Sequence, residues 1–273
     1  MKDPEQIVCK PTPWFTLRAA AMLVMFSVFA VLFFVDGTTG YRKKNLEFYV
    51  HKTFQKATAT FSQMNSDGDL TAQGWNEFTE EQTVDFPSDL SLLPEGTDPK
   101  MKWPAILSDY AKIKPLQHNL LWQEYSGENR MSNKIAEHPF DAGKIQEQIV
   151  VFYICLGLAL VTLYILVRTS RRTIRADSEA LFTSGGRSIP YTDMKTLDLR
   201  KWDTKGIAII DFEGTSGRGR ARIDGLTYGG FKKEQDQPAE KLMDRIRANF
   251  SGEIIEYTTA AAEGVKQIPT EGA

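Results

Sequence analysis

The chain has 273 residues, of which 42% are hydrophobic and 25% charged, and its formal net charge at pH 7 is −2. This hydrophobic content excludes a disordered chain, and the near-neutral charge excludes a strongly basic nucleic-acid-binding protein. The apolar residues are concentrated in two runs, which predict an integral membrane protein of α+β class with soluble domains outside the membrane.

The first apolar run predicts a transmembrane helix over residues 14–36, behind a short N-terminal segment of residues 1–13. About 20 apolar residues are needed to cross the hydrocarbon layer, and this run meets that length. Thr12 can cap the helix, with Pro13 in the first turn. The run ends at Asp36, and no small-x-small cleavage site follows it, which favours an uncleaved anchor over a signal peptide.

The segment between the two runs, residues 37–146, predicts a small, mostly helical domain. Gly37 to Gly40 is expected to break the chain before an amphipathic helix begins. Apolar residues then recur at three- and four-residue spacing from Leu46 to Met64, which indicates one buried helix face. Tryptophans and aliphatic residues later in the segment can cover that face.

Two further features of this segment follow from its prolines. Residues 84–102 contain three prolines and predict an irregular connection. Trp103-Pro104 is expected to open a short helix that Pro115 ends.

A stretch at the end of the amphipathic helix, residues 63–75, resembles the calcium loop of an EF-hand. Asn65, Asp67 and the glycine and leucine that follow match the pattern, whereas Gln63 and Gly74 stand where carboxylates are expected. The resemblance implies a weak Ca²⁺ site with Asn65, Asp67 and Asp69 as candidate ligands. The alternative is a helix–turn–helix that keeps the turn and has lost the metal.

The second apolar run predicts a transmembrane helix over residues 147–168, with its helical start near Asp141. Beyond it lies a basic cluster typical of the cytoplasmic side of a membrane: Arg168, Arg171, Arg172 and Arg175. Both chain ends are therefore expected in the cytoplasm, and residues 37–146 outside it. Arg42, Lys43 and Lys44 oppose this orientation, although long loops are translocated largely regardless of charge.

The remainder of the chain changes to short strands separated by glycine-rich turns, followed by a helix over residues 238–250. This pattern over residues 169–256 resembles the pleckstrin-homology-like domain that bacterial membrane proteins carry after a span. The resemblance implies an antiparallel β-domain capped by one helix, with ligands near the loop from Ser184 to Arg187. Residues 257–273 predict a disordered tail.

Three arginines, Arg218, Arg220 and Arg222, alternate along one predicted strand and therefore share one face of it. Near a membrane, such a row can bind anionic lipid headgroups. The alternative is a solvated face on which these arginines pair with Asp211 and Glu213 of the neighbouring strand.

The cysteines and histidines carry no recognisable chemistry. Cys9 and Cys155 are the two cysteines, and neither lies in the loop, so no disulfide is expected there. His51, His118 and His138 have no metal-ligand spacing. Motifs of metalloproteases, serine hydrolases, P-loop enzymes and thiol oxidoreductases are all missing from the sequence, so no enzyme and no obligatory cofactor is predicted.

These features together favour a non-enzymatic membrane adaptor or sensor, with the lipid bilayer and another protein as partners and no nucleic acid. The other protein would contact the extracytoplasmic loop or the cytoplasmic domain. The lack of loop disulfides and the β-domain after the second span favour a bacterial source, and that source would place the protein in the inner membrane. The alternatives are a subunit of an oligomeric small channel or transporter, formed through homo-oligomerisation, and a membrane enzyme of unrecognised type.

Overall fold

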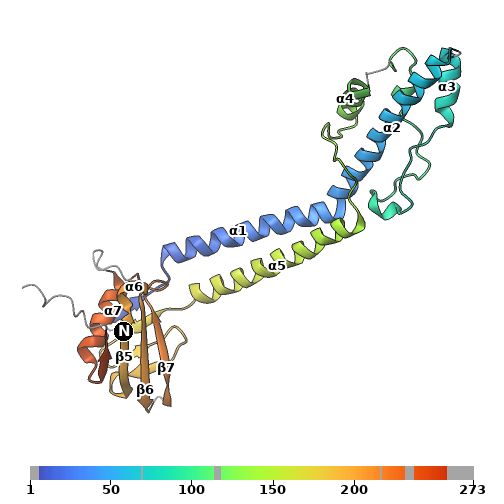
Figure 1. Cartoon of the computed structure of the whole chain (residues 1–273). Helices are drawn as coiled ribbons and strands as arrows, with labels where there is room; N and C mark the ends of the chain where they lie inside the picture. The colour runs from blue at the N-terminus through green and yellow to red at the C-terminus, as the bar shows by residue number, and fades with distance from the viewer. Residues whose placement is uncertain (1–5, 69, 114–117, 216, 231–236, 257–273) are drawn as a thin grey trace, which may run out of the picture. The chain divides into compact units, whose positions relative to one another are not determined.

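The computed structural model describes residues 6–68, 70–113, 118–215, 217–230 and 237–256. It is a mixture of helices and β-sheets (Figure 1). The described residues fall into two compact units. The β-unit combines residues up to 25 with residues from 159 onward, and the helical unit comprises residues 26–158.

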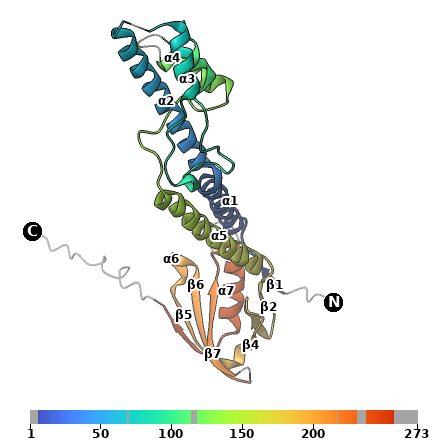
Figure 2. The ribbon, with the colours of Figure 1, turned by 90° about the vertical axis from the view of Figure 1, so that its right-hand side faces the viewer.

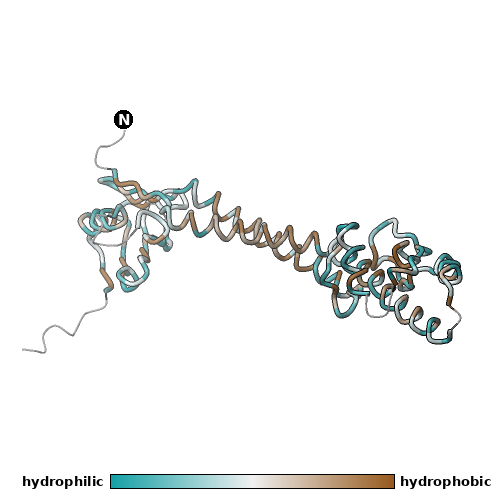
Figure 3. Tube along the Cα trace, turned by 90° about the horizontal axis from the view of Figure 1, so that it is seen from above, coloured by the Kyte–Doolittle hydropathy of each residue, from teal (hydrophilic) through white to brown (hydrophobic). Residues whose placement is uncertain are grey.

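Two helices are long and apolar enough to cross a membrane, by length and composition. Helix α1 (Pro13–Val35) continues through a π-helical turn, η1 (Asp36–Gly40), into α2 (Tyr41–Ser66), so residues 13–66 form one unbroken helix. Helix α5 (Ala142–Ser170) is the second. Only 11% of the most apolar window of each helix is buried, and Figure 3 shows the hydrophobic residues along both.

The prediction that the segment from Gly37 to Gly40 breaks the chain was wrong, because local hydrogen bonds keep this segment helical. Thr38 donates from its hydroxyl to the carbonyl of Phe34 at 2.7 Å. Arg42 donates to the carbonyls of Gly37 and Thr38, each at 2.7 Å. These side chains donate to backbone carbonyls in and next to the wider π-helical turn, where the regular α-helical hydrogen bonds are interrupted.

The helical unit is built on α2, which α3 (Ala72–Glu81) and α4 (His118–Glu128) accompany. Short 3₁₀ turns, η2 (Leu90–Leu92) and η3 (Ala105–Ser108), interrupt the irregular chain between them. The predicted apolar face of α2 is confirmed, since the buried core contains its regularly spaced members Val50, Phe54, Ala57 and Phe61. Trp75 of α3 packs among them and donates from Nε1 to the carbonyl of Leu107 at 2.9 Å.

Two details of the helical unit differ from expectation. The helix after Trp103-Pro104 is only the 3₁₀ turn η3, which ends at Ser108, and Pro115 lies outside the described residues. Helix α4 was not predicted, because its apolar residues form no clean stripe: Leu121 and Trp122 are buried, whereas the adjacent Leu120 is 62% exposed. The expected irregular connection over residues 84–102 is present, with η2 inside it.

The β-unit contains two four-stranded sheets. The first has strand order β1-β2-β3-β4 and is antiparallel throughout. Its strands are β1 (Ile7–Cys9), β2 (Ile174–Ala176), β3 (Ala180–Phe182) and β4 (Ser188–Pro190).

The second sheet has strand order β7-β6-β5-β8, in which β8 runs parallel to β5 and the other pairs are antiparallel. Its strands are β5 (Met194–Lys201), β6 (Ile207–Gly214), β7 (Gly217–Asp224) and β8 (Glu253–Ile255). A 3₁₀ turn, η4 (Tyr191–Asp193), precedes β5, and one helical turn, α6 (Trp202–Lys205), follows it.

Helix α7 (Pro238–Asn249) matches the predicted C-terminal helix and lies beside β1 and β2 (Figure 2). Leu242 and Ile246 of α7 share one buried core with Leu181 of the first sheet and with Ile210 and Phe212 of the second. The two sheets and the helix are therefore one packed unit. The predicted tail beyond residue 256 lies outside the described residues.

The N-terminal segment contributes a strand that the sequence did not predict. Residues 7–9 pair with residues 174–176, and Cys9 is only 1% exposed. Thr12 extends the attachment, because its N–H donates to the carbonyl of Thr227 at 2.8 Å. A strand of three residues gives almost no periodicity, and its partner lies far away in sequence. Strand β8 was missed for the same reason.

Candidate functional site

The structure brings together a set of polar residues where the helical unit meets its two apolar helices. Asn45 of α2 is fully buried and donates from Nδ2 to the carbonyls of Leu92 (3.0 Å) and Phe140 (2.8 Å). Its Oδ1 accepts from the N–H of Phe140 at 2.7 Å. Arg42 donates from Nε to the carbonyl of Ser91 at 2.9 Å, in addition to its bonds to η1. Arg42 and Asn45, which lie about one turn apart on α2, therefore hold two other segments in place: the chain just before α5 and the turn η2.

Aromatic and glycine contacts complete this arrangement, which we call the junction. The rings of Tyr41 and Phe140 stack at 4.1 Å between centroids, and the Lys44 ammonium lies 4.9 Å above the Tyr41 ring. Gly37 packs so closely on α5 that an added Cβ would lie 2.6 Å from Cδ1 of Ile149. The π-helical turn therefore packs closely on α5, and a larger residue at position 37 would require the side chain of Ile149 or the helix that carries it to shift.

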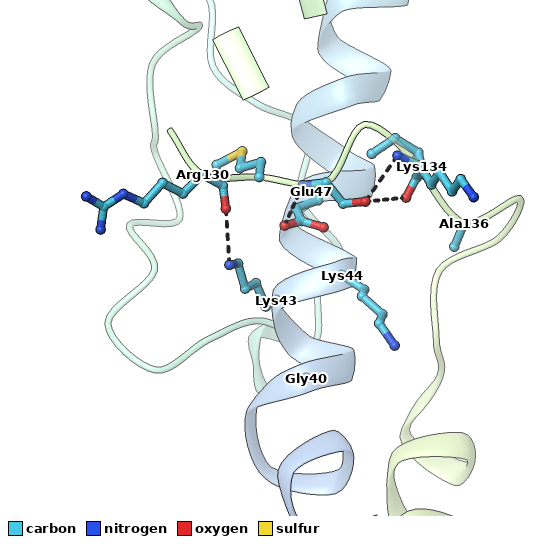
Figure 4. A pocket seen from close by; sticks show the side chains of 10 residues that line it. Gly40, Lys43, Lys44, Glu47, Arg130, Lys134 and Ala136 are labelled. Atoms are coloured by element: carbon cyan, nitrogen blue, oxygen red, sulfur yellow. Dashed lines mark hydrogen bonds between the residues drawn. The ribbon is translucent and has the colours of Figure 1, made fainter. Parts of the chain in front are cut away.

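A pocket of about 580 Å³ lies next to the junction (Figure 4). It is lined by residues of α2 and of the chain after α4, including four cationic side chains and one acidic one: Lys43, Lys44, Glu47, Arg130 and Lys134. We call it the basic pocket. Glu47 is 5% exposed and accepts from the N–H of Ser132 at 3.2 Å, so its carboxylate holds the wall of the pocket in place.

The backbone at Arg130 is unusual, since this is the described non-glycine residue with a positive φ, at 53°. It lies two residues beyond the end of α4, where the N–H of Met131 donates to the carbonyl of Ser126 at 2.8 Å. This i to i−5 bond is typical of a helix C-terminus at which glycine normally occupies the left-handed position. An arginine there costs about 1 kcal/mol relative to glycine.

Near the predicted calcium loop, α2 extends through Ser66, so that Gln63 and Asn65 are helical. Asp67 follows the helix, Gly68 has a φ of +88°, and Asp69 lies outside the described residues. Among the described residues, no three His, Cys, Asp or Glu side chains gather where a metal ion could be held. Calcium binding by Asn65, Asp67 and Asp69 therefore stays a prediction.

The arginine row of β7 lies opposite acidic residues of β6. Arg220 donates from Nε to Asp211 at 2.7 Å and holds the pKa of that carboxyl below its usual range, chiefly through this hydrogen bond. Arg218 lies 4.0 Å from Glu213. Arg222 pairs with Asp224 of its own strand at 3.2 Å. Each guanidinium thus has an acidic neighbour, as the solvated-face interpretation predicts, and headgroup binding by this row stays a prediction.

The other basic residues noted in the sequence lie near the end of α5. Arg168 is in its last turn and donates to the hydroxyl of Tyr164 at 3.0 Å. Arg171 and Arg172 follow the helix, and Arg175 is in β2, where it lies 5.5 Å from the Phe182 ring centroid. In the turn between β3 and β4, Arg187 lies over the ring of Phe212. Within the turn itself, residues 183–187, Arg187 is the one basic residue.

Sequence reasoning noticed Lys43 and Lys44 only as residues that opposed the predicted orientation. Arg130 and Lys134 were not connected to them, because more than 80 positions separate the two segments in the sequence. The sequence feature that could have indicated this pocket was the basic run of residues 42–44, just after the first apolar helix. No described protein family, curated protein sequence or solved structure matches the chain.

Proposed function

We propose that this protein is an integral membrane adaptor or sensor, with α1 and α5 in the bilayer, the helical unit on one side and the β-unit on the other. The observation that carries the proposal is the unbroken helix of residues 13–66, which begins in the β-unit and ends as the core helix of the helical unit. Its apolar part exposes large side chains, such as Leu17 and Val24 at 61% each. A bilayer removes the cost of leaving such side chains in water.

The N-terminal strand supports the predicted orientation. Because β1 and β2 pair within one sheet, the residues that precede α1 and those that follow α5 belong to one unit. Two crossings return the chain to the side from which it started, as this pairing requires. The arginines after α5 favour the cytoplasm for the β-unit, and the helical unit then lies outside it, as in a bacterial inner membrane.

The architecture of the β-unit supports a pleckstrin-homology-like domain. The resemblance implies an antiparallel β-domain capped by one helix, and in the β-unit every strand pair except β5–β8 is antiparallel, with α7 packed on the core that both sheets share. In this proposal the unit acts as a docking module for a cytoplasmic protein, and the helical unit contacts an extracytoplasmic protein or ligand. The junction links the two, because Arg42 and Asn45 fix the same helix that crosses the bilayer.

The first test is the labelling of single cysteines in sealed membrane vesicles of known orientation. In a Cys9→Ala/Cys155→Ala background, Glu95→Cys reports on the helical unit, and Lys205→Cys and Val8→Cys report on the β-unit. A membrane-impermeant maleimide is expected to label Glu95→Cys from the extracytoplasmic face. It should reach the other two only from the cytoplasmic face. Labelling of all three from one side would overturn the proposal.

The adaptor role itself is tested by cross-linking in cells, followed by purification in mild detergent and mass spectrometry. A stoichiometric partner joined through either unit is expected. A homo-oligomer with no second protein would instead favour the channel or transporter alternative.

A further inference from the structure

The basic pocket has an excess of positive charge that its own walls do not neutralise. Four cationic side chains line it against the single carboxylate of Glu47, which is turned to the backbone of Ser132. Lys43 donates to the carbonyl of Arg130 at 3.3 Å, and Lys44 lies 3.6 Å from Asp36. No acidic side chain among the described residues pairs with the charged groups of Arg130 and Lys134.

Figure 4 shows how the cations are distributed around the pocket. Lys44 and Lys134 extend on the side of Ala136, and Arg130 extends on the opposite side of the loop, where Lys43 reaches its carbonyl. The charged ends of Arg130 and Lys134 thus lie on different sides of the loop, and Lys43 lies between them. A cavity of about 580 Å³ with four cationic side chains in its lining has room for an anion larger than a single halide, and its positive charge attracts one.

The backbone of Arg130 supports a role for its side chain. Glycine would occupy the left-handed position after α4 without strain, yet the chain carries arginine there. Strained conformations of this kind concentrate at functional sites. The guanidinium is also the side chain best suited to bind phosphate oxygens through paired hydrogen bonds.

From these observations we propose that the basic pocket binds a phosphate-bearing anion. If α1 crosses the bilayer as proposed above, Gly40 and Lys44 lie within about three helical turns of Val35, at the level of the lipid headgroups. The anion is then the headgroup of an anionic phospholipid, and the alternative source of the same chemistry is a free phosphate compound. Occupancy of the pocket would bear directly on the junction, because Lys44 belongs to both.

Calorimetric titration of the full-length protein in neutral detergent tests the proposal. The probes are dihexanoyl phosphatidylglycerol, inorganic phosphate and, as a neutral lipid, dihexanoyl phosphatidylcholine. Phosphatidylglycerol is expected to bind, with an affinity that the double variant Lys44→Gln/Lys134→Gln lowers roughly tenfold or more. The control, Lys52→Gln/Lys100→Gln, removes two exposed lysines of the same unit that lie outside the pocket and should leave the affinity unchanged.

The variant Arg130→Gly distinguishes an effect on anion binding from an effect on folding stability. Because glycine suits the backbone at this position, the thermal midpoint should stay the same or rise, while the anion affinity falls. Binding of phosphatidylglycerol alone identifies the lipid as the source, and binding of inorganic phosphate as well identifies a free phosphate compound.

The proposal is overturned if neither anion binds, or if the pocket and control variants weaken binding equally. These titrations are made in detergent, so their outcome is independent of the vesicle labelling that tests membrane orientation.

Discussion

Asn45 connects three separate segments of the helical unit through one buried amide. Removing the amide leaves two carbonyls and one N–H without their partner in the interior. We expect Asn45→Ala to lower the free energy of unfolding by about 2–4 kcal/mol, since each unsatisfied buried group costs about 1–3 kcal/mol. Asn129→Ala, which removes an exposed bond to the carbonyl of Tyr125, should change it by less than about 0.5 kcal/mol.

Denaturant unfolding followed by tryptophan fluorescence measures this difference, because Trp75, Trp103 and Trp122 are all buried in the helical unit. Equal effects of the two substitutions would show that Asn45 does not hold the junction together.

His51 is expected to make the stability of the helical unit depend on pH. Its ring lies edge-on to Trp122, at 5.1 Å between centroids. Burial, and secondarily the charge of His118, lower the pKa of His51 from its ordinary value of 6.5. The unfolded chain therefore binds a proton more readily than the folded one, so stability is complete above pH 6.5 and falls as the pH drops through that value.

Thermal melting at about pH 7.5 and about pH 5.5 should reveal this dependence, with a slope below the roughly 1.4 kcal/mol per pH unit of one full proton. His51→Gln should flatten it, whereas the exposed His138→Gln should not. An unchanged slope in His51→Gln would assign the acid sensitivity to other groups.

At the scale of elements, the π-helical turn sets the rotation between α1 and α2. Inserting one alanine after Thr39 would rotate α2 by about 100° relative to α1. Gly37 could then no longer pack on Ile149 while Arg42 and Asn45 keep their partners. We expect the thermal midpoint of the helical unit to fall by several degrees. Thr39→Ala keeps the length, loses one exposed bond to Val35 and should behave like the unaltered protein.

This turn also shows what the sequence could and could not predict. The apolar stripe of α2, the start of α5 at Asp141 and the helix α7 follow from local periodicity and capping, and all three are confirmed. The glycines of η1 favour a break locally. They are helical in the structure, where Arg42 donates to the carbonyls of Gly37 and Thr38 and Gly37 packs on the distant Ile149; the contact with Ile149 leaves no local pattern in the sequence.

The residues of the candidate site also fall into those that a local sequence pattern indicates and those that only the tertiary structure brings in. Lys43 and Lys44 stand out as a basic run beside an apolar helix, whereas Arg130 and Lys134 join them only once α4 has folded back along α2. The row of arginines on β7 was conspicuous in sequence, and register explains its acidic partners: Arg220 lies opposite Asp211, and Arg218 lies opposite Glu213.

At the scale of the whole molecule, the pairing of β1 with β2 is open to a direct chemical test. Cys9 is buried in this sheet, and burial raises the pKa of its thiol to about 12. In a Cys155→Ala background, maleimide should therefore react with Cys9 only after denaturation. The control carries Val8→Cys and Cys9→Ala; position 8 is 38% exposed and should react at once. Rapid reaction of Cys9 in the native protein would show that β1 is detached from the sheet.

The placement of β1 also fixes the order in which the protein can be completed during synthesis. Strand β1 is synthesised before its partner β2, which emerges only after both apolar helices and the entire helical unit. Until then β1 cannot form this pair, and the edge that β2 offers it is open to unwanted pairing. If α1 and α5 cross the membrane as proposed, the β-unit can close only after both helices have been made and inserted. Under the same proposal, a chain whose second helix failed to insert would leave β1 and β2 on opposite faces of the membrane. Such a chain would display an incomplete sheet to the proteases and chaperones that remove misassembled proteins.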